Sequence, residues 1–256
     1  MKKLLIRISI AVVILLILGV MAVCLSLDSA VKRGIETVGP MLTKVEVKLD
    51  SVNLSLLSGG GKIKGLVVGN PAGFKAASAI QVGSASLSLQ PGSVFSDKVI
   101  IKSINLQAPE ITFETDLKGN NLSKILANVQ AATGGSDNSN QNAAGKSGKK
   151  LQVDDFLISG AKVHVSVTTL GGASATVPLP EIHLTGLGQG PDGITPAELT
   201  KVVLQEIEKA AVQVASTSVA DLGKNAASLT KGLGGTATGA TDKVTKGLGG
   251  LFKKNQ

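Results

Sequence analysis

Around residue 50, apolar and polar residues alternate one by one: residues 44–49 read KVEVKL and residues 51–56 read SVNLSL. Such alternation predicts β-strands with one apolar and one polar face. The phase shifts at Asp50, which predicts a bulge or turn. Turn sequences at 58–61, 69–71 and 91–92 separate further strands at 62–68, 80–89, 99–106 and 110–115. This spacing favours a mainly β fold built on an antiparallel, meander-like amphipathic sheet with flanking helices.

Three segments instead show the 3.6-residue spacing of amphipathic helices. The first is a short helix that we expect to start at Asp28-Ser29 and to stop at Gly39-Pro40. The second covers residues 122–129 and follows the sequence GNN. The third starts at Thr195-Pro196-Ala197-Glu198, which combines an N-cap Thr, a first-turn Pro and the Glu of a capping box. We expect it to run to Ser218 as a C-terminal amphipathic helix.

One strand pattern occurs twice. Residues 99–114 (VIIKSINLQAPEITFE) match residues 151–166 (LQVDDFLISGAKVHVS) in their apolar positions and in the central turn. We interpret both segments as copies of one hairpin unit. Residues 133–150 between them are rich in Gly, Ser, Asn and Lys and are expected to form a flexible linker. Residues 175–187 are expected to supply another strand or two, for which Pro178 and Pro180 favour an edge position.

The N-terminus has the pattern of a membrane segment. Residues 8–27 carry no charge, and a helix of 20 residues spans about 30 Å, the thickness of a bilayer core. Basic residues precede it and set the topology, with the N-terminus cytoplasmic and residues 28–256 across the membrane: Lys2, Lys3 and Arg7. Two alternatives stay open, namely cleavage as a signal peptide near Val20-Met21-Ala22 and lipidation of Cys24.

The charge distribution agrees with a membrane location. Of the net charge of +8, the first seven residues carry +3, the last 38 carry +4 and residues 28–218 carry +1. A nucleic-acid-binding protein usually has its positive charge on the folded domain, and aromatic residues make up only 2% of the chain. No nucleic-acid partner is therefore expected. One Cys and two His exclude a Cys-rich zinc site, and we expect neither a metal nor a cofactor.

No group of residues points to catalysis. Asp154 and Asp155 are neighbours on a predicted strand and so point to opposite faces. His164 and His183 lie between apolar residues, on the polar faces of their strands. Ser58 precedes three glycines, but the Gly-Lys-Ser/Thr of a phosphate-binding loop does not follow. We therefore expect a protein that is not an enzyme.

The last 38 residues form a separate Gly- and Lys-rich segment. The sequence TKGLGG occurs at 230–235 and again at 245–250, and eight glycines disfavour a stable helix. Interspersed Lys and apolar residues predict a weak amphipathic helix on anionic lipid, with a mobile solubilising tail as the alternative. The expected membrane-surface contacts are Lys231, Leu233, Lys246, Leu248, Leu251 and Phe252.

The apolar face of the sheet is the main candidate for function. Such a face packs on helices, pairs with another sheet or holds lipid chains. We expect a groove that binds acyl chains and is lined by Val45, Val47, Leu49, Leu54, Leu56, Ile101, Ile104, Leu106, Ile111 and Phe113. The alternative is a structural or scaffolding protein whose apolar face is an ordinary core, covered by the helix at 195–218.

In the order of its features, the chain resembles the AsmA-like family of bacterial envelope proteins. The resemblance rests on the anchor, the short helix, residues 44–74 (KVEVKLDSVNLSLLSGGGKIKGLVVGNPAGF), the strands at 99–114 and the GNNL sequence at 119–122. It covers about residues 1–130, with residues 151–186 as a returning repeat. Members of this family resemble bridge-like lipid transfer proteins, with a long curved sheet that forms an apolar groove and reaches from the inner membrane into the periplasm.

The resemblance implies a single-pass inner-membrane protein with its bulk in the periplasm, acting in envelope lipid homeostasis or outer-membrane assembly. Its expected partners are membrane lipids, with other envelope proteins or self-association as further options. The chain is far shorter than typical members, so bridging a periplasm would need oligomers or a partner. The expected organisation is an anchor at 1–27, an AsmA-like β domain at 28–132, the linker at 133–150, a returning hairpin unit and helix at 151–218, and the tail at 219–256.

Overall fold

The computed structural model describes residues 27–55, 57–116, 119–134, 149–167 and 173–232, with side chains described up to residue 218. Residues 27–43 are helical, and the later helices are α2 (Asn121–Gly134) and α3 (Pro196–Gly232). A short 3₁₀ helix, η1 (Pro91–Phe95), joins β4 to β5. The strands are β1 (Val47–Lys48), β2 (Ser51–Leu54), β3 (Gly60–Gly69), β4 (Ser78–Leu89), β5 (Lys98–Gln107), β6 (Glu110–Asp116), β7 (Gly119–Asn120), β8 (Lys150–Ser159), β9 (Lys162–Val167), β10 (Ala173–Pro178) and β11 (Ile182–Leu187).

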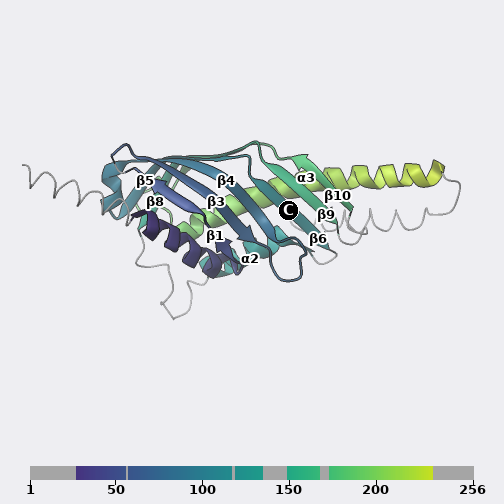
Figure 1. Ribbon diagram of the computed structural model, residues 1–256, viewed down its shortest axis with the longest axis horizontal. Coiled ribbons are helices and arrows are strands. Elements are labelled where there is room, and N and C mark those ends of the chain that lie inside the picture. The colour runs from purple at the N-terminus through teal and green to yellow at the C-terminus, as the bar shows by residue number, and fades with distance from the viewer. Residues whose placement is uncertain (1–26, 56, 117–118, 135–148, 168–172, 233–256) are drawn as a thin grey trace, which may run out of the picture.

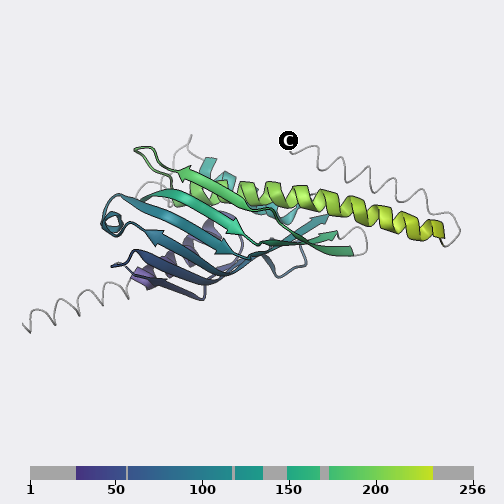
Figure 2. The ribbon, with the colours of Figure 1, turned by 90° about the horizontal axis from the view of Figure 1, so that it is seen from above.

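These eleven strands belong to one sheet, which curls into a half-barrel (Figures 1 and 2). The main path runs in the order β10-β9-β6-β4-β5-β8-β11, with β3 also beside β4, β1 and β2 beside β3, and β7 beside β6. The prediction of a mainly β fold with a curved sheet and a C-terminal helix is confirmed.

Several strands are two parts of one longer strand. β5 and β6 both run antiparallel to β4 in one continuous register, since Ser84 lies opposite Gln107 and Gln81 lies opposite Glu110. In the same way β8 and β9 follow β5 and β6, and β10 and β11 follow β9 and β8. The predicted hairpins at 99–114 and 151–166 are therefore wrong. Each segment is a single strand, because the turn-forming residues at its centre bend the chain without reversing it.

The two repeated segments lie side by side. β5 and β6 pair with β8 and β9 in parallel at a constant offset of 52 residues, from Lys98 opposite Lys150 to Thr115 opposite Val167. This is the offset at which the two sequences match, so the repeat exists as predicted. The expectation of a wholly antiparallel sheet is corrected by this parallel pair. Parallel neighbours need a long crossover connection, and α2 lies in that connection.

The interruptions of neighbouring strands line up across the sheet, and we call this line the crease. Three of its residues have left-handed φ angles, namely Gly65 (64°), Ala108 (47°) and Gly160 (65°). At the crease the inward alternation changes phase, so that Leu106 and Ile111 both pack against the core. The phase shift predicted near Asp50 is the first point of this line. From edge to edge, the crease passes through Asp50, Gly65, Gly83, Ala108, Gly160 and Pro180.

α2 and α3 cover the inner face of the sheet. α2 packs on β6 and β7, α3 packs on β6, β9, β10 and β11, and the two helices contact each other. Figure 2 shows α3 lying along the sheet and extending beyond it. The apolar side expected for α2 is its packed side. In α3 the buried positions lie one residue beyond most of the expected apolar positions, which are only partly buried. The buried residues are Leu122, Ile125, Leu126 and Val129 in α2 and Leu204, Ile207, Ala211 and Ala215 in α3.

The predicted capping box starts α3. Glu198 N donates to Thr195 Oγ1 at 3.1 Å, and Thr195 N donates back to Glu198 Oε2 at 2.8 Å. The Thr195 hydroxyl also donates to this carboxylate, at 2.7 Å. The two hydrogen bonds that the carboxylate accepts from Thr195 lower the pKa of Glu198 below its usual value of 4.5, and the bond from the backbone N–H has the larger effect. α3 runs past the predicted end at Ser218 to Gly232, so part of the expected tail is helical.

The helix over residues 27–43 runs along the free edge of β1 and β2. Three of its side chains, spaced one turn apart, bond to the backbone of that edge. Because an unpaired edge is a template for association, this arrangement closes one side of the sheet. The bonds are Leu54 N to Asp28 Oδ1 (2.8 Å), Lys32 Nζ to Asp50 O (2.9 Å) and Leu49 N to Glu36 Oε1 (3.1 Å).

This helix passes the predicted stop at Gly39-Pro40 and ends at residue 43. A Pro in the last turn removes only one intrahelical hydrogen bond, and Lys44 N still donates to Pro40 O at 3.0 Å. Gly39 is required by packing, since a Cβ there would lie 2.9 Å from the Val47 side chain. The prediction of a stop at this pair was therefore one turn too early.

Among the described residues, no helix is long and apolar enough to cross a bilayer. The predicted anchor, apart from residue 27, lies outside the described residues, and so do residues 135–148 of the linker and the tail from residue 233. The topology expected from Lys2, Lys3 and Arg7 and the surface contacts expected from Lys231 to Phe252 remain predictions.

Candidate functional site

The crease divides the inner face of the sheet into two halves. We call the half that contains β6, β9 and β10 the distal half, and the half that contains β2, β5, β8 and β11 the proximal half. Residue 27 enters at the proximal end, where Asp28 contacts Leu54 at the end of β2. The distal half is closed, because α2 and α3 pack on it. Its central side chains have no exposed surface: Ile111, Phe113, Val163, Val165 and Val167.

Two rows of apolar side chains cross the proximal half from strand to strand. The partners follow directly from the register of β2, β3, β4, β5, β8 and β11. We call these two rows the proximal floor. The first row is Leu54, Gly61, Leu87, Ile104, Phe156 and Leu184, and the second is Val52, Ile63, Ala85, Leu106, Ile158 and Ile182.

The proximal floor is less enclosed than the distal half. Leu54, Leu87, Ile104 and Leu184 in the first row are only partly buried. At Gly61, the missing side chain leaves space that Leu54 and Leu87 fill, since a Cβ there would lie 2.7 Å from both. Phe156 in the first row and Ile158 in the second are buried. The floor is therefore a continuous apolar surface on the inner face of the curved sheet, and its access to solvent is confined to part of its side chains.

The ten residues predicted to line a groove fall into three groups. Five are buried in the packed structure: Val45, Val47, Leu49, Ile111 and Phe113. Four are partly buried: Leu54, Ile101, Ile104 and Leu106. Leu56 lies outside the described residues. The structure thus brings Leu54, Ile104 and Leu106 together on the proximal floor and places Ile111 and Phe113 beneath α2 and α3.

Sequence reasoning missed several members of the proximal floor. Phe156 is the partner of Ile104 in the repeat, so the offset of 52 residues was a signal that could have identified it. Leu87 alternates with serines in β4, and Leu184 alternates with polar residues in β11. Their positions beside Ile104 depend on strand pairing, which the sequence alone does not give.

A buried carboxylate organises the distal end. Glu114 on β6 is 2% exposed. It accepts hydrogen bonds from Lys75 N (2.8 Å to Oε1) and Ala76 N (3.0 Å to Oε2), and from Asn70 Nδ2 at 3.4 Å. Because buried charge is costly unless it is hydrogen-bonded, these donors fix the loop between β3 and β4 on the end of β6.

Asn121 completes this cluster at the start of α2. Its Oδ1 accepts from Glu114 N (3.0 Å), and its Nδ2 donates to Asn70 Oδ1 (2.9 Å) and to Thr112 O (2.8 Å). The GNPAGF and GNNL sequences, on which the family resemblance partly rests, therefore meet in space. Their side chains bond to each other and to backbone, which gives this motif a structural role.

The outer face of the sheet is polar. His183 Nε2 lies 2.5 Å from Asp155 Oδ1, and His164 Nδ1 lies 2.9 Å from Thr176 Oγ1, with Glu110 3.7 Å from the other ring nitrogen. Both imidazoles are about half exposed. In the part of the chain that the structure describes, no three His, Cys, Asp or Glu residues approach closely enough to hold a metal ion.

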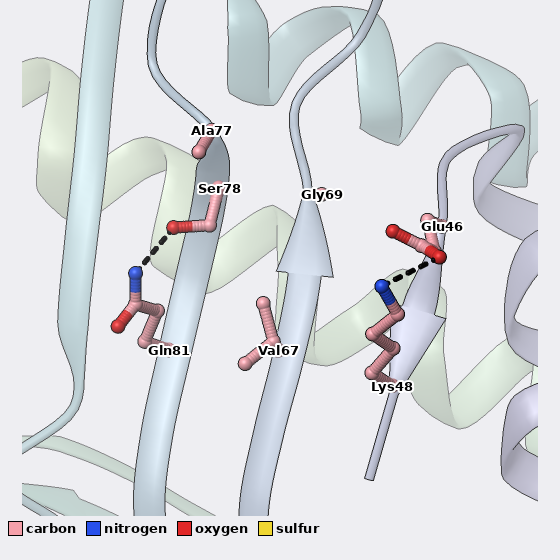
Figure 3. Close-up of a pocket in the computed structure, with 7 residues that line it drawn as sticks. All are labelled: Glu46, Lys48, Val67, Gly69, Ala77, Ser78 and Gln81. Atoms are coloured by element: carbon pink, nitrogen blue, oxygen red, sulfur yellow. Dashed lines mark hydrogen bonds and ion pairs between the residues drawn. The ribbon is translucent and has the colours of Figure 1, made fainter.

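A shallow hollow of about 240 Å³ lies between β1, β3 and the start of β4 (Figure 3). Glu46 and Lys48 form a 2.8 Å ion pair on one side, and Gln81 Nε2 donates to Ser78 Oγ on the other. The Glu46 and Lys48 side chains are about two-thirds exposed. These polar groups are paired with each other, and the hollow is separate from the proximal floor.

Comparisons with protein-family models, with curated proteins and with solved structures find no match to this chain.

Proposed function

We propose that this protein is a non-enzymatic, membrane-anchored protein of the bacterial envelope, AsmA-like in kind, whose proximal floor binds lipid acyl chains. In this proposal residues 8–27 span the inner membrane, and the sheet lies on its periplasmic side. The protein serves envelope lipid homeostasis or outer-membrane assembly, and membrane lipids are its partners.

The observation that carries the proposal is the difference between the two halves of the inner face. In the distal half, Ile111 and Phe113 are fully enclosed, which leaves no room for a ligand. In the proximal half, Leu54, Leu87, Ile104 and Leu184 of the first row are only partly buried, although Phe156 between Ile104 and Leu184 is buried. Lipid-binding sites are concave and mostly apolar, and the floor combines both properties at the end where the chain arrives from its predicted anchor.

The second candidate is a scaffolding protein with no ligand. It is favoured by the packing of α3 on β6, β9, β10 and β11, which covers much of the inner face. In that case the partly buried side chains of the first row are the edge of an ordinary hydrophobic core. The curved sheet then serves only to position other envelope components.

The two candidates differ in whether an acyl chain reaches β5. The full chain is reconstituted in bilayers whose phospholipid carries a photoactivatable group in the acyl chain, and is then irradiated and digested with trypsin. Cleavage after Lys102 and Lys118 releases peptide 103–118, which contains Ile104 and Leu106. Lipid adducts on this peptide, in addition to adducts on residues 8–27, are the expected result.

Two substitutions make the labelling specific to the floor. Ile104→Trp adds bulk to the inner face, and we expect it to reduce adducts on peptide 103–118 several-fold. Leu157→Trp adds the same kind of bulk on the outer face of the neighbouring strand, beside Asn105, and should leave labelling unchanged. Adducts confined to residues 8–27 in the unmodified chain would overturn lipid binding and support the scaffold.

A further inference from the structure

Three connections meet at the proximal end of the sheet and form what we call the tip: the described residues of the β2–β3 turn (55 and 57–59), η1 and the segment that enters β8 at Lys149. Leu89 N donates to Gly59 O at 2.6 Å, which joins the turn to the start of η1. Lys149 Nζ donates to Ser96 O at 3.0 Å, which joins the third segment to the end of η1. The tip also lies beside residue 27, since Asp28 Oδ1 accepts from Leu54 N at 2.8 Å.

The tip exposes two large apolar side chains. Leu57 in the turn is 88% exposed, and Phe95 at the end of η1 is 74% exposed. Among the described residues, the only other large apolar side chain that is clearly exposed is Met41, at 45%. Scattered apolar residues are normal on a surface, but here the two most exposed ones lie on adjacent connections at one end of the molecule.

Both side chains project from connections that hydrogen bonds hold in place. In the turn, Gly59 N donates to Ser55 O at 2.8 Å. In η1, the buried Ser93 donates from Oγ to Gln90 O (2.7 Å) and accepts from Ile100 N (2.9 Å). The backbone of both connections therefore loses little conformational freedom when Leu57 and Phe95 pass from water into a less polar environment.

The sequence that precedes residue 27 indicates that this environment is a lipid bilayer. Residues 8–27 are uncharged and long enough to span a bilayer, and they join the helix that starts beside the tip. The charged residues around the tip are of both signs, with Lys98, Lys149 and Lys150 near Asp28, Asp97 and Asp192. Electrostatic attraction to anionic lipid is therefore not the main interaction expected of the tip. We expect apolar contact with the hydrocarbon boundary of the bilayer instead.

We propose that the tip docks on the membrane, with Leu57 and Phe95 inserted at the interface of the leaflet from which residue 27 emerges. This rests on the proposed function in one respect, the membrane-spanning anchor. Docking would hold Leu54, where the first row of the proximal floor begins, close to the lipid surface. An acyl chain could then pass from the leaflet onto the floor without crossing water.

The test uses the absence of Trp and Tyr from the chain, which makes any introduced Trp the dominant fluorophore. Leu57→Trp and Phe95→Trp are compared in the full chain with Met41→Trp. Met41 is a matched control because it is exposed and apolar but lies 14 residues along the same helix from residue 27, or about 21 Å. Each variant is placed in phosphatidylcholine vesicles with and without bromine atoms on the acyl chains.

We expect brominated lipid to quench the Leu57→Trp and Phe95→Trp emission at least twofold and the Met41→Trp emission little. The quenching should persist at 1 M salt, because the contact is apolar and is not screened. If all three variants float with the vesicles but are quenched equally little, docking is wrong while the anchor stands. If the chain does not float with the vesicles, both the anchor and docking are wrong. If the tip variants are quenched but peptide 103–118 acquires no lipid adduct, docking holds and acyl-chain binding fails.

Discussion

Three Gly→Ala substitutions along the crease separate three effects on stability: the low strand propensity of Gly, the cost of a left-handed backbone conformation, and overpacking. At Gly83 the φ angle is not left-handed, and an added Cβ would meet nothing within 4 Å. At Gly160 the φ angle is +65°, and the nearest atom would be 3.9 Å away. At Gly65 the φ angle is +64°, and the Cβ would lie 1.9 Å from Asp50 Oδ2 and 2.8 Å from Asp50 Cβ.

The expected costs follow from these environments. Gly83→Ala should be neutral or stabilise the fold by up to about 1 kcal/mol, because Gly is unfavourable within a strand. Gly160→Ala should cost about 1–2 kcal/mol, the price of a left-handed conformation for an L-residue. Gly65→Ala carries the same conformational cost and about 1–3 kcal/mol more for overpacking against Asp50. The total for Gly65→Ala is therefore about 2–5 kcal/mol.

The assay is urea unfolding of the full chain in mild detergent, followed by far-ultraviolet circular dichroism and extrapolated linearly to water. Adding Asp50→Gly to Gly65→Ala removes the overpacking but not the conformational cost, so the double variant should unfold with about the cost of Gly160→Ala. If Gly83→Ala destabilises as much as Gly160→Ala, or if Asp50→Gly rescues nothing, the description of the crease is wrong.

Two further predictions concern single side chains, and a third concerns the topology. Glu114→Gln should lower the free energy of unfolding by about 1–3 kcal/mol, because one of two acceptor oxygens is replaced by a donor that faces N–H groups. The exposed control Glu110→Gln should change the free energy of unfolding by less than about 0.5 kcal/mol. Equal effects of the two substitutions would contradict the hydrogen-bonded cluster around Glu114. Because the pKa of Glu198 is lower in the folded state, its carboxylate stabilises the fold above the usual pKa of 4.5. This contribution is lost as the pH falls through the lowered pKa. The difference in stability between the unmodified chain and Glu198→Gln should therefore shrink when urea unfolding is repeated at lower pH, and a difference that grows would refute the capping role of Glu198. A reporter fused after Gln256 that is active only in the cytoplasm should stay silent, and activity there would reverse the topology expected from the basic N-terminus.

Features governed by local chemistry could be predicted from the sequence. Alternation located the strands, because a sheet with one covered face requires a period of two. Thr195 and Glu198 located the start of α3, because a capping box is closed within four residues. The edge position favoured by Pro178 and Pro180 agrees with β10 and β11, which pair only with β9 and β8 among the described strands.

Features governed by pairing could not be predicted. Ala108-Pro109 reads as a turn, and its left-handed Ala108 is what a turn contains; whether the chain reverses there or only bends depends on β4, which runs straight past it. The same holds for the site. Ile104 and Ile111 have equivalent alternating patterns, yet one is partly buried and the other fully enclosed, because α2 and α3 both pack on β6, which carries Ile111.

The two edges of the sheet bear on how far such a groove can extend. A bridge across a periplasm would require strands to be added at an edge, and an added strand needs free N–H and C=O groups. At the β1–β2 edge, Asp28 and Glu36 already accept two backbone N–H groups and Lys32 donates to one carbonyl. At the opposite edge, Pro178 and Pro180 each remove a donor. Extension of the sheet by edge pairing is therefore disfavoured on both sides. If the protein binds lipid, we therefore expect it to act at the membrane surface beside its tip and not along a sheet extended across the periplasm. Any self-association would use a surface other than the sheet edges.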